Sequence, residues 1–203
     1  MTDHRTRVGR ERSDRTEQRI VAAALRVFAE HGPDAPVIDH FLQAAAISRG
    51  TFYNHFKTVE ELLHATSEWT TRQMVERIER ALAGIDGPML RFGVGLRLFF
   101  AHAQRDPVWC RFVGKVWKID GIELPVRDLD DGIRAGQFRV LDRDAALDVV
   151  FGAIRAALER IGEQRVSATF GDHVTELCLH ALRADPRRIA AVLARELPAL
   201  DAS

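Results

Sequence analysis

The chain has 203 residues, enough for one large domain or for a small domain followed by a larger one, and either arrangement can bury a substantial core. Hydrophobic residues make up 46% and charged residues 29%, which excludes an intrinsically disordered chain. The formal net charge is zero, so no global field attracts nucleic acid, and no apolar run approaches the ~20 residues that span a bilayer.

Residues 1–14 are polar and rich in arginine and show no apolar periodicity, so we expect a flexible basic arm. Such an arm is either a disordered terminus or a segment that reaches DNA phosphates or a minor groove. Three acids dilute its charge: Asp3, Glu11 and Asp14.

Two helices are predicted after this arm. The first runs from about Thr16 to His31 and ends at Gly32-Pro33, because glycine and proline stop a helix. The second begins near Pro36, which the first turn of a helix tolerates because its N–H groups have no partner there. Its apolar residues recur at helical spacing and form one narrow face: Phe41, Leu42 and Ala45.

A third, short helix follows a tight turn. Ser48 suits its N-cap, because a serine hydroxyl accepts the unpaired N–H groups of a first turn, and Phe52 and Phe56 share its buried side. The remaining positions carry donor-rich groups and no carboxylate: Arg49, Thr51, Tyr53, Asn54, His55 and Lys57. Such groups suit phosphates and base edges. Two helices joined in this way form a helix-turn-helix, whose second helix fits the major groove of B-DNA.

The stretch Ile47 to Phe56, with Glu60-Glu61-Leu62 after it, resembles the signature of the tetracycline-repressor (TetR) family. The resemblance covers about residues 15–65, because upstream positions match the first helix of that family's DNA-binding domain: Ile20, Ala23, Ala24, Phe28 and Gly32. It implies a three-helix DNA-binding domain at 15–62 and a larger helical ligand-binding and dimerisation domain at 63–203. The residues expected at double-stranded DNA are Val37, Ser48, Arg49, Gly50, Thr51, Tyr53, Asn54, His55 and Lys57.

Four positions depart from the family's usual pattern. The family has Thr where Val37 stands and Lys where Val59 stands, so each valine removes a phosphate contact. Ala46 replaces the usual turn glycine and costs up to about 1 kcal/mol if the residue takes a positive φ. Asp39 places an acid near the DNA-facing start of the second helix, where it helps only the helix dipole. These departures keep open an alternative, a ligand-binding dimer of the same fold that has lost DNA binding.

A long fourth helix is predicted from Thr58 to Ala83, with Thr58 and Glu61 as its capping box. The clearest break in the chain is Gly84 to Pro88. Apolar helical patterns then run over residues 89–103, 108–116, 124–135, 142–161, 169–182 and 186–197. The fold class is therefore predicted to be all-α. No catalytic motif is recognisable, so we expect a binding protein and not an enzyme.

The first three segments after the break hold most of the large apolar side chains, and most of these belong to the core. By resemblance, this middle region of the TetR family encloses a small-molecule cavity. We expect its lining to combine aromatic bodies with a few polar atoms: Phe99, His102, Trp109, Cys110, Phe112, Trp117 and Arg155. The predicted effector is small and largely apolar or aromatic, and no cofactor is expected.

In residues 142–161 small side chains alternate with branched apolar ones, a pattern that lets two helices approach closely. Together with residues 169–182 it resembles the dimerising four-helix bundle of the TetR family. The predicted homodimer interface comprises Val149, Ala153, Ala156, Phe170, Val174, Leu177, Cys178 and Ala181. Such a dimer presents two recognition helices to successive major grooves, ~34 to 36 Å apart. His173, Glu176 and His180 share one side of the last long helix, and we interpret them as a polar rim of the interface in preference to a metal site.

Cys110 and Cys178 lie far apart in the sequence, without the spacing of a zinc site or a disulfide framework, and the first residues lack an apolar signal region. These features suit a soluble cytoplasmic protein without membrane contact. The combined prediction is a repressor that binds a palindromic operator as a homodimer and is released by its effector.

Overall fold

The structure is a computed structural model that describes residues 2–116, 126–163 and 166–200, with side chains from residue 12 onward. Trp117 lies outside the described residues. The described part of the chain contains ten helices and no strand, which confirms the all-α prediction. They are α1 (Thr2–His31), α2 (Ile38–Ala45), α3 (Arg49–His55), α4 (Val59–Ala81), α5 (Pro88–Arg105), α6 (Pro107–Val116), α7 (Val126–Arg134), α8 (Arg143–Gly162), α9 (Phe170–Ala181) and α10 (Pro186–Ala194).

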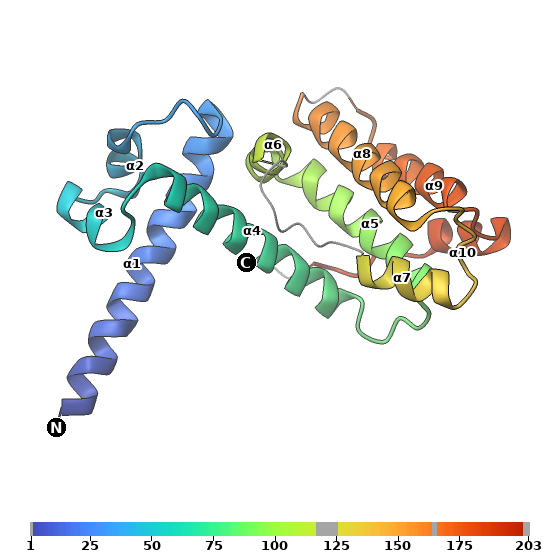
Figure 1. Cartoon of the computed structure of the whole chain (residues 1–203), viewed down its shortest axis with the longest axis horizontal. Coiled ribbons are helices and arrows are strands. Elements are labelled where there is room, and N and C mark those ends of the chain that lie inside the picture. The colour runs from blue at the N-terminus through green and yellow to red at the C-terminus, as the bar shows by residue number, and fades with distance from the viewer. Residues whose placement is uncertain (1, 117–125, 164–165, 201–203) are drawn as a thin grey trace.

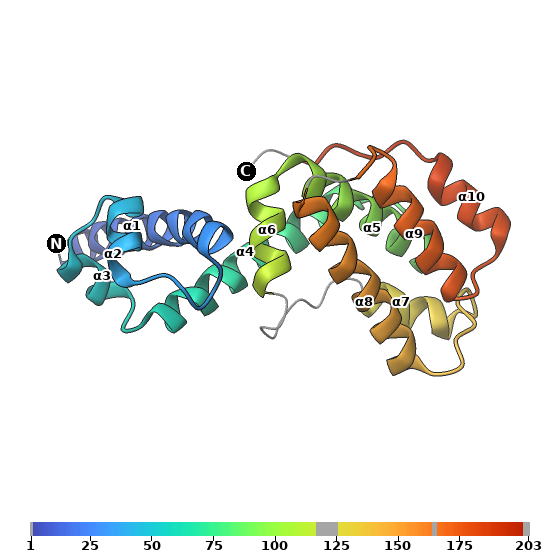
Figure 2. The same cartoon turned by 90° about the horizontal axis from the view of Figure 1, so that it is seen from above.

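Helices α1, α2 and α3 form a small head, and α5 to α10 form a larger body (Figure 1). Helix α4 runs from one to the other, and the view from above in Figure 2 shows α6 between the head and the rest of the body. The boundary predicted between residues 62 and 63 therefore falls inside α4. Three phenylalanines, one from each helix of the head, are fully buried in its core: Phe28, Phe41 and Phe52.

Two predicted helix starts are wrong. Helix α1 begins at Thr2 and not near Thr16, so the segment expected to be a flexible arm is helical and projects beyond α2 and α3 (Figure 1). This segment has no proline and a single glycine, and extending an existing helix costs far less than nucleating one. Helix α2 begins at Ile38, with Val37 as its N-cap, so Pro36 lies before the helix and not in its first turn.

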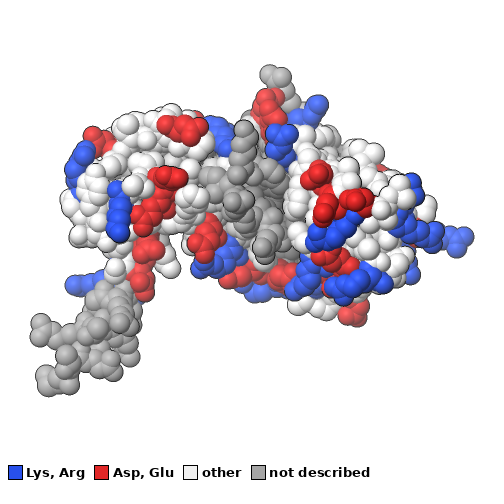
Figure 3. Space-filling model, in the orientation of Figure 1, with Lys and Arg blue, Asp and Glu red and all other residues white. Residues whose placement is uncertain are grey.

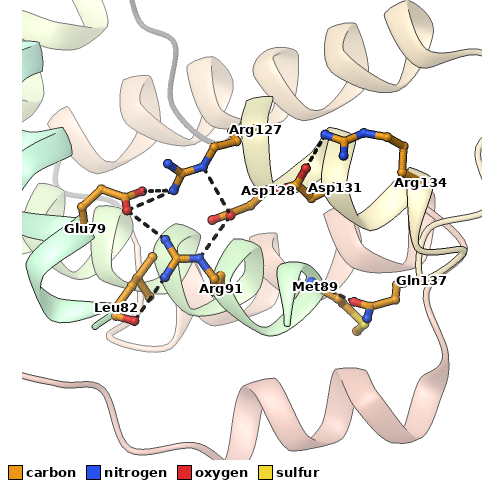
Figure 4. Close-up of polar contacts among 9 residues, drawn as sticks. All are labelled: Glu79, Leu82, Met89, Arg91, Arg127, Asp128, Asp131, Arg134 and Gln137. Atoms are coloured by element: carbon orange, nitrogen blue, oxygen red, sulfur yellow. Dashed lines mark hydrogen bonds and ion pairs between the residues drawn. The ribbon is translucent and has the colours of Figure 1, made fainter. Parts of the chain in front are cut away.

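The body is built around α5, whose apolar side chains are buried on nearly every side. The end of α4 is fixed to it by a network around Arg91 (Figure 4). Arg91 donates from Nη2 to Glu79 Oε2 on α4 (2.9 Å), from Nε to Asp128 Oδ1 on α7 (3.2 Å) and from Nη1 to the carbonyl of Leu82 (3.2 Å). Arg127 Nη2 also donates to Glu79, at 3.0 Å from Oε1. One guanidinium thus joins α4, α5 and α7.

A second arginine of α5 holds the C-terminal helices. The side chain of Arg97 is 7% exposed and donates from Nε to Asp172 Oδ1 on α9 (2.7 Å). Its Nη1 donates to the carbonyls of Val192 and Arg195 at the end of α10, both at 2.7 Å. A buried guanidinium is tolerated because an acid and two carbonyls accept from it.

Helix α6 joins the head to the body. Lys115 Nζ donates to the carbonyls of Ala29 (2.8 Å) and Glu30 (3.1 Å) at the end of α1, where the helix dipole favours a cation. Phe112 places its ring 6.2 Å from that of Phe28 in the head. Helix α6 of the body is therefore in direct contact with α1 of the head.

Candidate DNA-binding surface and effector site

The turn between α2 and α3 has the geometry that the sequence indicates. Ala46 takes the left-handed conformation (φ 50°, ψ 53°), and its N–H donates to Gln43 O while that of Ile47 donates to Leu42 O. These two bonds close α2 in a Schellman motif, whose left-handed position favours glycine. Ser48 caps α3 by accepting from the N–H of Thr51 at 3.1 Å, as predicted.

The outward face of the head carries most of the predicted DNA-binding side chains. Tyr53 is 48% exposed, and Arg49, Asn54 and Lys57 are exposed beside it. Figure 3 shows charges of both signs over the described surface on this side of the molecule, without an extended patch of either sign. The predicted DNA contact therefore depends on a few donors and not on a large basic field.

Arg49 has a partner within the head. Its Nη2 donates to Oδ1 of Asp39 on α2, so the acid expected to hinder DNA binding pairs with the arginine expected to read bases. Both side chains are exposed, and an exposed ion pair contributes only about 0 to 1 kcal/mol. A guanine or a phosphate can therefore replace Asp39 as the acceptor at small cost.

His55 does not lie on the outward face, which corrects the prediction of a DNA contact from its side chain. The side chain is 9% exposed, and Nδ1 lies 3.6 Å from Glu17 Oε2 on α1. As the last residue of α3 it faces the neighbouring helix, so its position holds α3 against α1. The hydroxyls of Ser48 and Thr51 lie 2.9 Å apart and serve the cap of α3.

Three of the predicted effector residues form an aromatic cluster between α5 and α6. The ring of Trp109 lies 5.2 Å from that of Phe99 and 4.7 Å from that of His102, both edge to face. Burial, and next the charge of Arg77, lower the pKa of His102 to about 4, so its imidazole is neutral at pH 7.

The other predicted effector residues lie elsewhere. Cys110 is fully buried and donates from Sγ to the carbonyl of Leu158 on α8 (3.4 Å), and burial raises the pKa of its thiol to about 11. Phe112 faces Phe28 in the head. Arg155 is exposed, because the buried side of α8 is formed by other residues, which corrects its prediction as a lining residue.

All eight residues predicted for the dimer interface line one shallow groove of about 400 Å³ on the outer side of α8 and α9. Val149 is 53% and Leu177 is 69% exposed within it. Large apolar side chains exposed together in this way mark an interaction surface. Whether a second copy covers this groove stays a prediction.

Comparison with known proteins identifies the family. A family model described as bacterial regulatory proteins of the tetR family matches residues 20–66. The HTH-type transcriptional regulator CymR of Pseudomonas putida is 30% identical over 169 residues, which cover 74% of this chain and 81% of that protein. The chain belongs to the TetR family of transcriptional regulators.

Solved structures of TetR-type regulators share the fold. RolR in complex with resorcinol has a TM-score of 0.65 and 24% identity and covers 94% of this chain and 99% of its own. FadR of Bacillus subtilis in complex with stearoyl-CoA has a TM-score of 0.68 and 19% identity, with 81% and 98% covered. This TetR-family chain is thus a DNA-binding transcriptional regulator and not an enzyme.

In this TetR-family regulator two polar residues of α4 were missed by sequence reasoning. Thr70 and Arg77 share one side of α4 with the buried Met74, and Thr70 is 2% exposed. Their signal in the sequence is weak, because each interrupts an apolar helical face once. Among the described residues, no three His, Cys, Asp or Glu side chains are placed to hold a metal ion. No described helix is long and apolar enough to cross a bilayer.

Proposed function

We propose that this TetR-family regulator is a repressor that binds a palindromic operator as a homodimer and that a small, largely apolar or aromatic effector releases it. The observation that carries the proposal is the outward face of α3. It presents Tyr53, Asn54 and Lys57 to solvent while Phe52 anchors the helix in the core of the head. A recognition helix enters the major groove in this way.

The groove on α8 and α9 supports the homodimer. Its small residues, including Ala153 and Ala156, let two helices approach closely, and Val149 and Leu177 add exposed apolar surface. A second copy with the same groove gives an isologous interface with two-fold symmetry. A two-fold dimer presents both α3 helices to a palindrome.

The position of α6 supports release by an effector. Trp109 belongs to the aromatic cluster, and Lys115 on the same helix contacts the end of α1. An effector that binds one position of α6 better than another shifts the population between two arrangements of the heads. RolR with resorcinol and FadR with stearoyl-CoA are structural relatives with bound small molecules.

The test is selection of genomic DNA fragments by the purified protein at low salt, followed by competition at physiological salt. We expect an enriched palindrome that the wild type retains in the competition. The double variant Tyr53→Ala/Asn54→Ala should lose it, and Arg187→Ala, an exposed change on α10, should not. No enrichment at either salt would instead support the alternative function, a ligand-binding dimer without DNA binding, which the Asp39 pair with Arg49 and the exposed Val37 favour.

A further inference from the structure

Among the described residues, two buried polar atoms of α4 have no hydrogen-bond partner. They are Oγ1 of Thr70 and Nε of Arg77, both buried. Among the described residues no carboxylate pairs with the Arg77 guanidinium, whereas Arg91 and Arg97 of α5 each bind acids. An arginine stays protonated in proteins, so Arg77 keeps a positive charge on a half-buried side chain.

Thr70 and Arg77 lie on one side of α4, and Arg77 is near the aromatic cluster. They lie seven positions apart on α4, two helical turns, and therefore share one side of the helix, with the buried Met74 between them. Arg77 is close enough to His102 for its charge to contribute to the lowered pKa of that imidazole. His102 in turn contacts Trp109. The charge of Arg77 on α4 thus acts on a neutral imidazole of α5 that contacts an indole of α6.

The unpaired atoms of Thr70 and Arg77 lower the stability of the ligand-free protein, and a ligand that pairs with them would remove this loss. A buried donor or acceptor without a hydrogen bond costs roughly 1 to 3 kcal/mol, and more when it is charged. Residues of this kind persist where a ligand completes them, because the ligand recovers that energy on binding. The guanidinium fork of arginine matches a carboxylate, and aromatic rings pack edge to face with other rings.

From this juxtaposition we infer that the effector is a small aromatic acid whose carboxylate pairs with Arg77 and whose ring packs against Trp109 and Phe99. The inference deepens the proposed function and rests on its effector site. Thr70 supplies a hydroxyl on the same side of α4 for a polar substituent of the ring. The neutral His102 offers a donor and an acceptor without adding a second charge that would compete for the carboxylate.

The test is calorimetric titration of the full chain with a series of monocyclic aromatic carboxylates and, as matched neutral probes, their primary amides. We expect at least one carboxylate to bind more tightly than its amide. Arg77→Gln should weaken that carboxylate roughly 10- to 100-fold and leave the amide unchanged, as expected for loss of a charge-assisted hydrogen bond. Arg72→Gln is the control, because Arg72 lies on the same helix, is exposed and pairs with Glu68.

Thermal unfolding without ligand separates a binding role from a structural one. If Arg77 serves the ligand, Arg77→Gln should leave the Tm unchanged or raise it, since an unpaired buried donor is removed. A lower Tm together with equal binding of acids and amides would show that the guanidinium is satisfied within the protein and would overturn the inference. Binding of phenols or amides with no preference for any acid would overturn it as well.

DNA binding is measured in parallel with the same preparations. If the protein binds an aromatic acid but no DNA, the proposed repressor function is wrong and the effector class is supported. If the protein binds DNA, and no aromatic acid either binds the protein or releases the DNA, the effector class is wrong and the repressor function stands.

Discussion

The alanine at the turn of the helix-turn-helix allows a quantitative test of the local reasoning. Ala46 has φ 50° and ψ 53°, a conformation that costs a residue with a Cβ roughly 1 to 2 kcal/mol. Glycine removes this strain but adds about 0.4 to 1 kcal/mol of unfolded-state entropy. Ala46→Gly should therefore raise the free energy of unfolding by about 0.5 to 1 kcal/mol. For a chain of this length that corresponds to a Tm higher by about 1 to 4 °C.

The matched control is Ala44→Gly, two residues earlier. Ala44 is exposed and helical, so glycine relieves no strain there and should destabilise by about 0.5 to 1 kcal/mol. Thermal unfolding followed by circular dichroism measures both variants against the wild type. We predict a higher Tm for Ala46→Gly and a lower Tm for Ala44→Gly than for the wild type. A lower Tm for both variants would refute the role assigned to the left-handed turn.

The remaining predictions concern DNA, assembly and pH. Lys57→Ala should weaken binding to all DNA sequences alike and reduce the slope of log affinity against log salt by about 1. Arg49→Ala should lower the binding free energy by about 1 to 3 kcal/mol at one base position. Equal losses on all sequences for both variants would contradict the separate roles of the two residues. Leu177→Arg should give a monomer in sedimentation. Leu141→Arg is the control, because Leu141 is exposed outside the groove, and it should leave the dimer intact. If each of the two variants is a dimer, the α8 and α9 interface is excluded. The folded pKa of His102, about 4, lies below its ordinary 6.5, so its contribution to stability is present above pH 6.5 and is lost as the pH falls from 6.5 to 4. In urea titrations His102→Gln should reduce this loss, and an unchanged pH profile would show that the imidazole is not desolvated.

What the sequence predicts best is set by local periodicity. The spacing of Phe41, Phe52 and Phe56 predicts which sides of α2 and α3 are buried, and all three residues are buried. Ser48 is recognisable as a cap because the hydroxyl acts within its own first turn. The groove on α8 and α9 was predictable because its small and apolar residues repeat at helical spacing on two successive helices.

The failures depend on contacts between distant segments. His55 looks like a DNA contact by its chemistry, but Glu17 on another helix faces it. Arg155 falls outside the buried side of α8, which its polar character alone does not reveal. Thr70 and Arg77 gain significance only in the folded chain, where Oγ1 and Nε are buried and have no hydrogen-bond partner among the described residues. A local stretch of sequence does not show which distant segments pack together.

We propose that two copies of this TetR-family regulator bind one palindrome through α3. Light scattering of the protein with the duplex enriched by fragment selection measures this directly, since it gives the mass of the complex. We predict two protomers for each duplex, loss of the complex with Tyr53→Ala/Asn54→Ala, and dissociation when the effector is added. A single protomer on each duplex, or a complex of unchanged mass and affinity with the α3 variant, would contradict the account.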